Sequence, residues 1–207
     1  MDEQASNGMR KTALLTSYAK DEPLLRLAKI LAKNGWNILC SAGTVSFLKE
    51  NGVPCTDVAD IVGPPILGHR VVTLSREIYA GLLAATPEDF AELKRLNISN
   101  IDLVYVNLYP LEKEIESQQA TPDSVLEKTD IGGPTLLRAA AKGRRLALSN
   151  PAQIDELEKW MANGSPEAAQ EQLALKFAAE AERRVSDYVF ASAQYWRKQS
   201  TEGHTVA

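Results

Sequence analysis

The chain has 207 residues, of which 44% are hydrophobic and 24% charged, a composition typical of a soluble protein that can bury a core. The net charge of −4 argues against a nucleic-acid-binding surface, and no apolar stretch approaches the roughly 20 residues that span a bilayer. With only two cysteines (Cys40 and Cys55) and two histidines (His69 and His204), the sequence offers neither a disulfide framework nor a zinc site. We therefore expect a cytoplasmic globular protein with no metal and with neither nucleic acid nor membrane as a partner.

The first part of the chain alternates strand and helix patterns after a lead-in over residues 1–10 that we expect to be flexible. The patterns predict a strand at 12–16, a helix from Pro23 to a stop at Gly35, a strand at 36–40, a helix at 45–51 and a strand at 53–58. This β-α-β-α-β order with short connections is typical of a parallel sheet with right-handed crossovers. The sequence thus predicts a three-layer α/β fold.

The later elements follow the same logic, except for residues 63–81, where Gly-Pro punctuation and a β-like run at 70–74 favour a functional loop. The remaining patterns predict helices at 87–96, 111–119, 134–142, 151–162 and 166–197, and strands at 101–106 and 147–149. We expect a nucleotide-binding core over 11–150, a helical segment over 151–200 packed on it, and a flexible tail over 201–207. The alternative for the last helix is a partner-binding surface.

Two polar loops follow the first two predicted strands. Thr16 to Lys20 offers hydroxyls and an amine, and Ser41-Ala42-Gly43-Thr44 leads into a helix. Ligands of parallel sheets bind at the carboxyl ends of the strands, and helix N-termini favour anions. Each loop alone fits an ordinary helix cap, but two on adjacent strands indicate one phosphate pocket.

Two further segments carry candidate chemistry. Asn107 ends the most apolar strand and Tyr109 offers a donor that can orient a carbonyl, although a strand-ending turn is the alternative. Asp130 precedes a Gly132-Gly133-Pro134 helix start, where free backbone amides can stabilise an oxyanion; a capping role for this carboxylate is equally open. Lys142 lies about 12 Å further along the helix, which by spacing alone indicates a helix C-terminal cation.

Taken together, these motifs resemble one family. The stretches TDIGGPTLLRAAAK (129–142), VNLYP (106–110), GVPCTDVADIVGPP (52–65), ALLTSYAK and CSAGT resemble the N-terminal IMP cyclohydrolase domain of the bifunctional purine-biosynthesis proteins, which also carry AICAR transformylase. The resemblance covers about residues 11–197 and implies a methylglyoxal-synthase-like fold. It also implies closure of the purine ring of FAICAR to give IMP, without a cofactor. A homodimer and a separate AICAR transformylase are the protein partners it suggests.

The resemblance further implies roles for individual residues. It assigns catalysis to Tyr109, Asp130 and Lys142. It assigns substrate and phosphate binding to Thr16, Lys20, Ser41, Gly43, Thr44, Arg70, Thr73, Asn107, Ile131, Gly132 and Gly133.

The chain departs from the family where the family reads Arg-Val-Lys-Thr-Leu-His-Pro-Lys. Here the lysine is Val72 and the histidine is Ser75, and Tyr18 replaces a usual serine in the first phosphate loop. Losing one charged donor from a preorganised site costs about 10²–10³ in rate. The leading hypothesis is therefore a divergent IMP cyclohydrolase. The alternatives are a non-catalytic nucleotide-binding regulatory or partner subunit and a cyclase for a related ribonucleotide.

Overall fold

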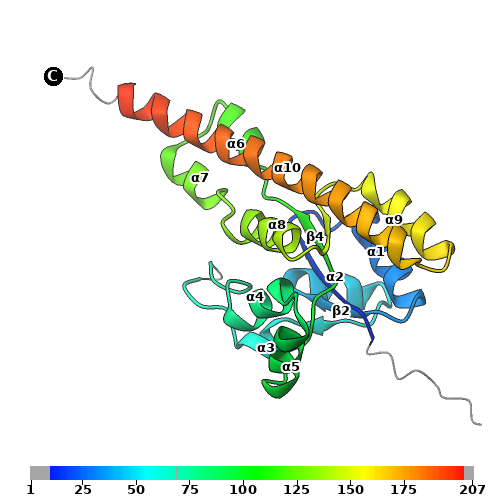
Figure 1. Cartoon of the computed structure of the whole chain (residues 1–207). Helices are drawn as coiled ribbons and strands as arrows, with labels where there is room; N and C mark the ends of the chain where they lie inside the picture. Colours follow the sequence, from blue (N-terminus) through cyan, green and yellow to red (C-terminus); the bar gives the residue numbers. More distant parts are fainter. Residues whose placement is uncertain (1–9, 69, 203–207) are drawn as a thin grey trace, which may run out of the picture.

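A five-stranded parallel sheet forms the centre of the protein in the computed structural model, which describes residues 10–68 and 70–202 (Figure 1). The strands are β1 (Thr12–Ser17), β2 (Asn37–Cys40), β3 (Thr56–Asp57), β4 (Leu103–Asn107) and β5 (Leu146–Leu148). They lie in the order β3-β2-β1-β4-β5, and every adjacent pair is parallel. This confirms the predicted α/β fold, with the two longest strands, β1 and β4, side by side within the sheet.

The described residues also form helices that connect and cover the strands. These are α1 (Glu22–Lys33), α2 (Ala42–Glu50), α3 (Ala59–Val62), α4 (Arg76–Leu83), α5 (Pro87–Arg95), α6 (Leu111–Glu116), α7 (Pro122–Glu127), α8 (Gly132–Lys142), α9 (Gln153–Ala162) and α10 (Glu167–Glu202). Local sequence signals explain where α1 begins. The Asp21 side chain accepts the Leu24 amide at 3.1 Å, and Pro23 lies in the first turn of the helix.

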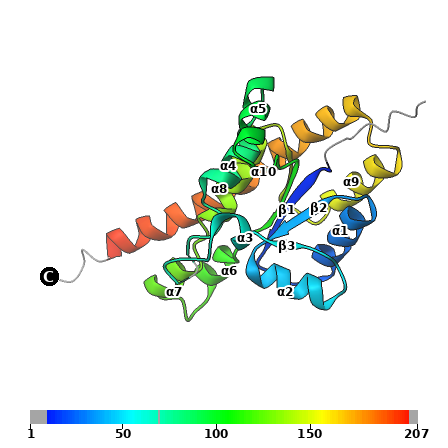
Figure 2. The same cartoon turned by 90° about the horizontal axis from the view of Figure 1, so that it is seen from below.

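The sheet separates two apolar cores because alternate side chains of each strand point to opposite faces. Figure 2 shows the helices on the two sides of the sheet, with α1 and α2 on one side and α4 and α8 on the other. Leu15 and Tyr105 pack on the side of α1, α2 and α9, whereas Leu14 and Val104 pack on the side of α4 and α8. Helix α10 runs along the β5 edge and contributes buried side chains to both cores (Figure 1). The long helix therefore covers an edge strand whose backbone would otherwise be open.

The structure differs from the sequence-based prediction between residues 63 and 81. This segment is not a loop throughout, because α4 begins at Arg76 and Ser75 caps it by accepting the Ile78 amide at 3.2 Å. The β-like run at 70–74 forms no strand, only an isolated bridge between Ile66 and Val71. The prediction missed the helix because the Ser75 cap lies directly after that run.

Two helices begin earlier than the sequence predicts. Helix α2 begins at Ala42 instead of 45, and α8 begins at Gly132 instead of 134. The small residues expected just before each helix therefore lie in its first turn. The helix expected over 111–119 ends at Glu116, and a separate helix, α7, follows. The flexible ends predicted at residues 1–10 and 201–207 lie almost entirely outside the described residues, as do His69 and His204.

Within residues 10–68 and 70–202, no helix is both long enough and apolar enough to cross a membrane. Over the same ranges, no three His, Cys, Asp or Glu side chains are grouped as metal ligands.

Candidate functional site

A cavity of about 580 Å³ lies at the carboxyl ends of the central strands, a volume suited to a small-molecule ligand. Its lining residues come from the ends of β1 and β4, from the loops after β1, β2 and β4 and the start of α2, from Gly68 and residues within 70–74, and from the end of α7 through the start of α8. They are Thr16, Ser17, Tyr18, Lys20, Ser41, Gly43, Gly68, Arg70, Val72, Thr73, Leu74, Asn107, Tyr109, Leu126, Glu127, Thr129, Asp130, Ile131, Gly132 and Gly133. All the predicted site residues are among them except Thr44 and Lys142.

Lys20 joins the first two loops. Its ammonium donates to the Ser17 carbonyl and, at 3.3 Å, to the Tyr18 carbonyl, and a Cβ placed on Gly43 would lie 3.9 Å from its Nζ. Burial lowers the pKa of Lys20, and no carboxylate of the described residues forms an ion pair with it. This cation beside the first turn of α2 is arranged to hold an anion.

Asn107 and Thr44, both predicted as binding residues, have different surroundings. The Asn107 side-chain oxygen accepts the Ala19 amide at 3.1 Å, and its backbone oxygen accepts the Tyr18 amide at 3.0 Å, so Asn107 fixes the first loop. Thr44 is fully buried in the first turn of α2 and does not line the cavity, and its hydroxyl has no hydrogen-bond partner among the described residues. Its backbone amide is also used, donating to the Ser41 carbonyl at 2.8 Å.

Asp130 is enclosed by backbone amides at the start of α8. Its Oδ1 accepts the Gly133 amide at 2.8 Å, and the amides of Tyr109 and Gly132 also bond to the carboxylate. Burial outweighs these bonds and raises the pKa of Asp130 above its ordinary value. The carboxylate therefore caps α8, as one alternative predicted, and at the same time faces the cavity with a pKa shifted toward that of a general acid or base.

Gly133 must be glycine for this arrangement. A Cβ at this position would lie 2.5 Å from Asp130 Oδ2, 2.6 Å from Leu108 Cδ2 and 3.0 Å from Val106 Cγ1. The Gly133 amide is also occupied by Asp130, so it is not among the free amides that the Gly-Gly-Pro motif suggested.

Two tyrosines line the cavity, and a lysine outside its lining contacts one of them. The rings of Tyr18 and Tyr109 lie 5.1 Å apart between centroids, tilted by 60°. The Lys128 Nζ lies 3.5 Å from the Tyr18 hydroxyl and 5.3 Å from its ring centroid. Both rings are partly exposed, so they present aromatic surface and hydroxyl groups to a ligand.

Another part of the lining comes from Gly68 and from residues within 70–74. Arg70 forms an ion pair with Glu127 at 2.8 Å, and both side chains are largely exposed. The Thr73 Oγ1 would lie 3.4 Å from a Cβ on Gly132, so the threonine contacts the first turn of α8. Val72, where the resemblance expects a lysine, lines the cavity and packs partly against the core beneath it.

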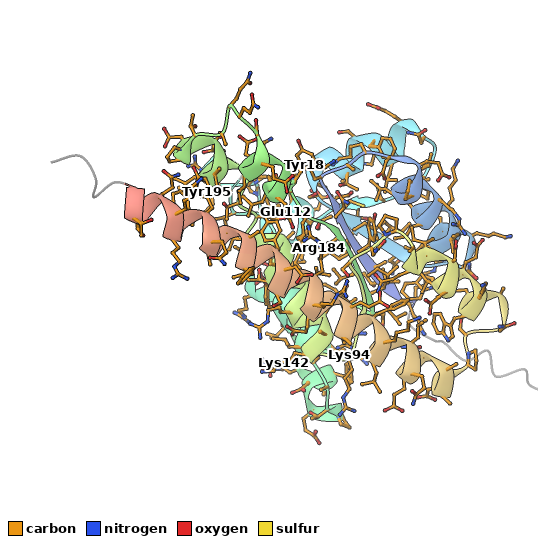
Figure 3. All side chains as sticks on the ribbon, turned by 90° about the horizontal axis from the view of Figure 1, so that it is seen from above. Tyr18, Lys94, Glu112, Lys142, Arg184 and Tyr195 are labelled. Carbon is orange, nitrogen blue, oxygen red and sulfur yellow. The ribbon has the colours of Figure 1, made fainter. Side chains whose placement is uncertain are left out.

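Lys142 lies away from this cavity. It is the last residue of α8, about 15 Å along the helix from Gly132, and its side chain is exposed. Figure 3 shows Lys142 near Lys94, at the opposite end of the molecule from Tyr18. Within a single chain, the position agrees with the helix C-terminal cation that spacing alone predicts.

Leu126 and Glu127 also line the cavity but were not predicted as site residues. Both lie on α7, a helix that was not predicted from the sequence. Thr121 and Ser124 form a capping box around the first turn of α7, with Pro122 at its first position, and these residues were the signal that could have found it.

Comparison with known proteins identifies the fold family. Residues 23–135, more than half of the chain, match the family described as MGS-like domain. The chain belongs to the MGS-like domain family. The match ends inside α8, so β5, α9 and α10 lie beyond the matched range of this MGS-like domain protein.

Relatives of this MGS-like domain protein include bifunctional purine biosynthesis proteins PurH. The one from Prochlorococcus marinus (strain MIT 9211) is 40% identical over 197 residues, which are 92% of this chain and 37% of that protein. The one from Caldicellulosiruptor saccharolyticus is 44% identical over 137 residues, 65% of this chain and 26% of that protein. The chain thus spans about a third of the length of these relatives, matching their N-terminal region.

A solved structure titled "Crystal structure of ForH" is also similar. It superimposes with a TM-score of 0.79 at 32% identity, covering 91% of this chain and 100% of that chain. This likeness extends over both the matched MGS-like range and most of the helices that follow it.

Proposed function

We propose that this chain closes the purine ring of FAICAR to give IMP, as a divergent IMP cyclohydrolase. The observation that carries the proposal is one cavity that gathers Lys20 from the loop after β1, Tyr109 from the loop after β4 and Asp130 from the segment just before α8. Similarity to the bifunctional purine biosynthesis proteins PurH supports the same class of substrate.

In the proposed complex, the phosphate lies against Lys20 and the first turn of α2. These provide an ammonium without a carboxylate partner and the positive end of a helix dipole. Tyr18 and Tyr109 give the base an aromatic surface at the mouth of the cavity. Orienting the carboxamide and the formamide toward each other makes the attack intramolecular, which supplies much of the rate.

The chemistry needs proton transfers, and Asp130 is the group we assign to them. The carboxamide nitrogen attacks the formyl carbon, forming the C–N bond while the formyl oxygen takes up a proton. The carboxamide nitrogen supplies that proton and keeps its other hydrogen. The formamide nitrogen then loses its proton as the C–O bond breaks, and the hydroxyl group takes up a proton and leaves as water. A carboxyl whose pKa is raised binds a proton more readily than an ordinary carboxylate, so Asp130 can accept and return these protons, and the Tyr109 hydroxyl can donate to the formyl oxygen.

The test is incubation with FAICAR while IMP formation is followed by chromatography, beside a protein-free sample. We expect formation of IMP above the spontaneous rate, and Asp130→Asn to lower turnover by about 10². Turnover equal to the protein-free sample would overturn the proposal.

Val72 favours one second candidate, a nucleotide-binding module without catalysis. An apolar side chain lines the wall where the resemblance expects a lysine, and valine can neither donate a proton nor stabilise an oxyanion. Calorimetry distinguishes the two functions: IMP binding without FAICAR turnover would support the module, and turnover would reject it.

A further inference from the structure

A buried tyrosine of the C-terminal helix reaches the segment that carries Asp130. The Tyr188 hydroxyl accepts the Asp130 backbone amide at 2.7 Å and donates to the Lys128 backbone carbonyl at 3.0 Å. The side chain is only 1% exposed and does not line the cavity. One phenol therefore bridges the two peptide groups that flank Thr129, without access to a ligand.

The tyrosine is itself held in place from a third element. The Arg184 guanidinium lies 5.5 Å from the Tyr188 ring centroid and forms an ion pair with Glu112 of α6 (Figure 3). Burial, together with the nearby carboxylates of Asp130 and Glu112, raises the pKa of Tyr188 to about 12, so its hydroxyl keeps the proton that it donates to Lys128.

The same segment has fixed contacts at its other atoms. The Thr129 hydroxyl donates to the Val125 carbonyl at 2.8 Å, and the Asp130 carboxylate accepts the Gly133 amide. The backbone amide of Asp130 has Tyr188 as its hydrogen-bond acceptor. Removing the phenolic hydroxyl thus releases the backbone at the residue whose carboxylate faces the cavity, while the core ring remains.

We propose that Tyr188 is a positioning residue: α10, which lies beyond the matched MGS-like range, holds the Asp130 carboxylate in its working position through this hydroxyl. The inference rests on the proposed function for its effect on turnover. Its structural part, control of the 128–130 backbone by the hydroxyl, can be measured independently of any reaction.

The experiment compares Tyr188→Phe with Tyr195→Phe in the full chain. Tyr195 lies seven residues further along the same helix, is also buried, and packs edge-on against Trp196 at 4.9 Å between centroids. The two variants lose the same atom from the same helix, so a difference between them reports on the hydroxyl contacts of Tyr188.

We expect Tyr188→Phe to lower kcat for FAICAR about tenfold with KM changed less than about twofold, because a misplaced catalytic group slows chemistry more than binding. Tyr195→Phe should keep both values. In hydrogen exchange followed by NMR, the Asp130 amide should exchange about tenfold faster in Tyr188→Phe only, while both variants retain cooperative thermal unfolding.

The results test the positioning role of Tyr188 and the proposed function separately. An unchanged Asp130 exchange rate, or a kcat equal to that of wild type, in Tyr188→Phe would overturn the positioning role. A wild type that forms no IMP would instead refute the proposed function, and the exchange rate would then still decide whether Tyr188 controls this backbone.

Discussion

Adding one methyl group at Gly133 tests the packing around Asp130. In Gly133→Ala, the new Cβ would lie 2.5 Å from Asp130 Oδ2 and 2.6 Å from Leu108 Cδ2. Real carbon atoms do not approach an oxygen this closely, so either the carboxylate or the start of α8 must move. Because Leu108 is buried, the least constrained response is displacement of the Asp130 side chain.

The cost follows from the number of contacts that must give way. Overpacking a close-packed interior costs about 1–3 kcal/mol, and the variant also strains the hydrogen bond from the Gly133 amide to the carboxylate. For a protein of this size, each kcal/mol lowers the melting midpoint by about 2–4 °C, so we expect a loss of about 2–12 °C. Displacing the carboxylate should also lower FAICAR turnover by about 10².

Gly132→Ala is the matched control, since its Cβ would meet Thr73 Oγ1 only at 3.4 Å and Asp130 Oδ1 at 3.9 Å. This variant should stay within about 0.5 kcal/mol of wild type in the free energy of unfolding, measured by urea denaturation. If Gly133→Ala and Gly132→Ala had equal stability and equal turnover, the close packing of the carboxylate on Gly133 would be refuted.

Three further variants test the remaining site residues. Lys20→Met should weaken IMP binding about 10–100-fold in calorimetry and leave inosine binding unchanged; an equal loss for both ligands would contradict the phosphate role. Val72→Lys should raise FAICAR turnover about tenfold over Val72→Met, and a decrease would show that the site has been rebuilt around an apolar wall. Lys142→Ala should keep turnover and IMP affinity within about twofold, because the residue lies outside the cavity; a fall of about 10² would instead support the catalytic role implied by the resemblance.

The fold could be predicted because its strands are buried on both faces. Such strands appear as short continuous apolar runs, for example residues 103–106, and the helices between them carry strong start and stop signals. Short helices such as α4 and α7 were missed because a helix of six to eight residues has too few turns to show periodicity. Their capping residues, Ser75 and Thr121, are the part of the signal that remains.

The candidate site could be predicted as a set of loops, since parallel strands place their carboxyl ends at one edge. What the sequence could not show is which backbone groups are already used. The Gly133 amide donates to the Asp130 carboxylate, and the Asn107 side-chain oxygen accepts the Ala19 amide in the loop after β1. Such pairings depend on tertiary contacts. The hydrogen bonds of the Tyr188 hydroxyl to residues 128 and 130 could not be predicted for the same reason. From the sequence, Tyr188 shows only the spacing of a buried helix residue.

Two of the departures from the family motif, Val72 and Ser75, have structural explanations, and these bear on the chemistry. Ser75 caps α4, a contact worth about 1 kcal/mol, and Val72 packs partly against the core beneath the cavity wall. Positions that carry a histidine and a lysine in the family thus have structural roles here. Of the cations at the cavity, Lys20 is bonded to backbone carbonyls and Arg70 to Glu127. Under the proposed function, ring closure would therefore rely on orientation and on proton transfer through Asp130 more than on a cation at the formyl oxygen.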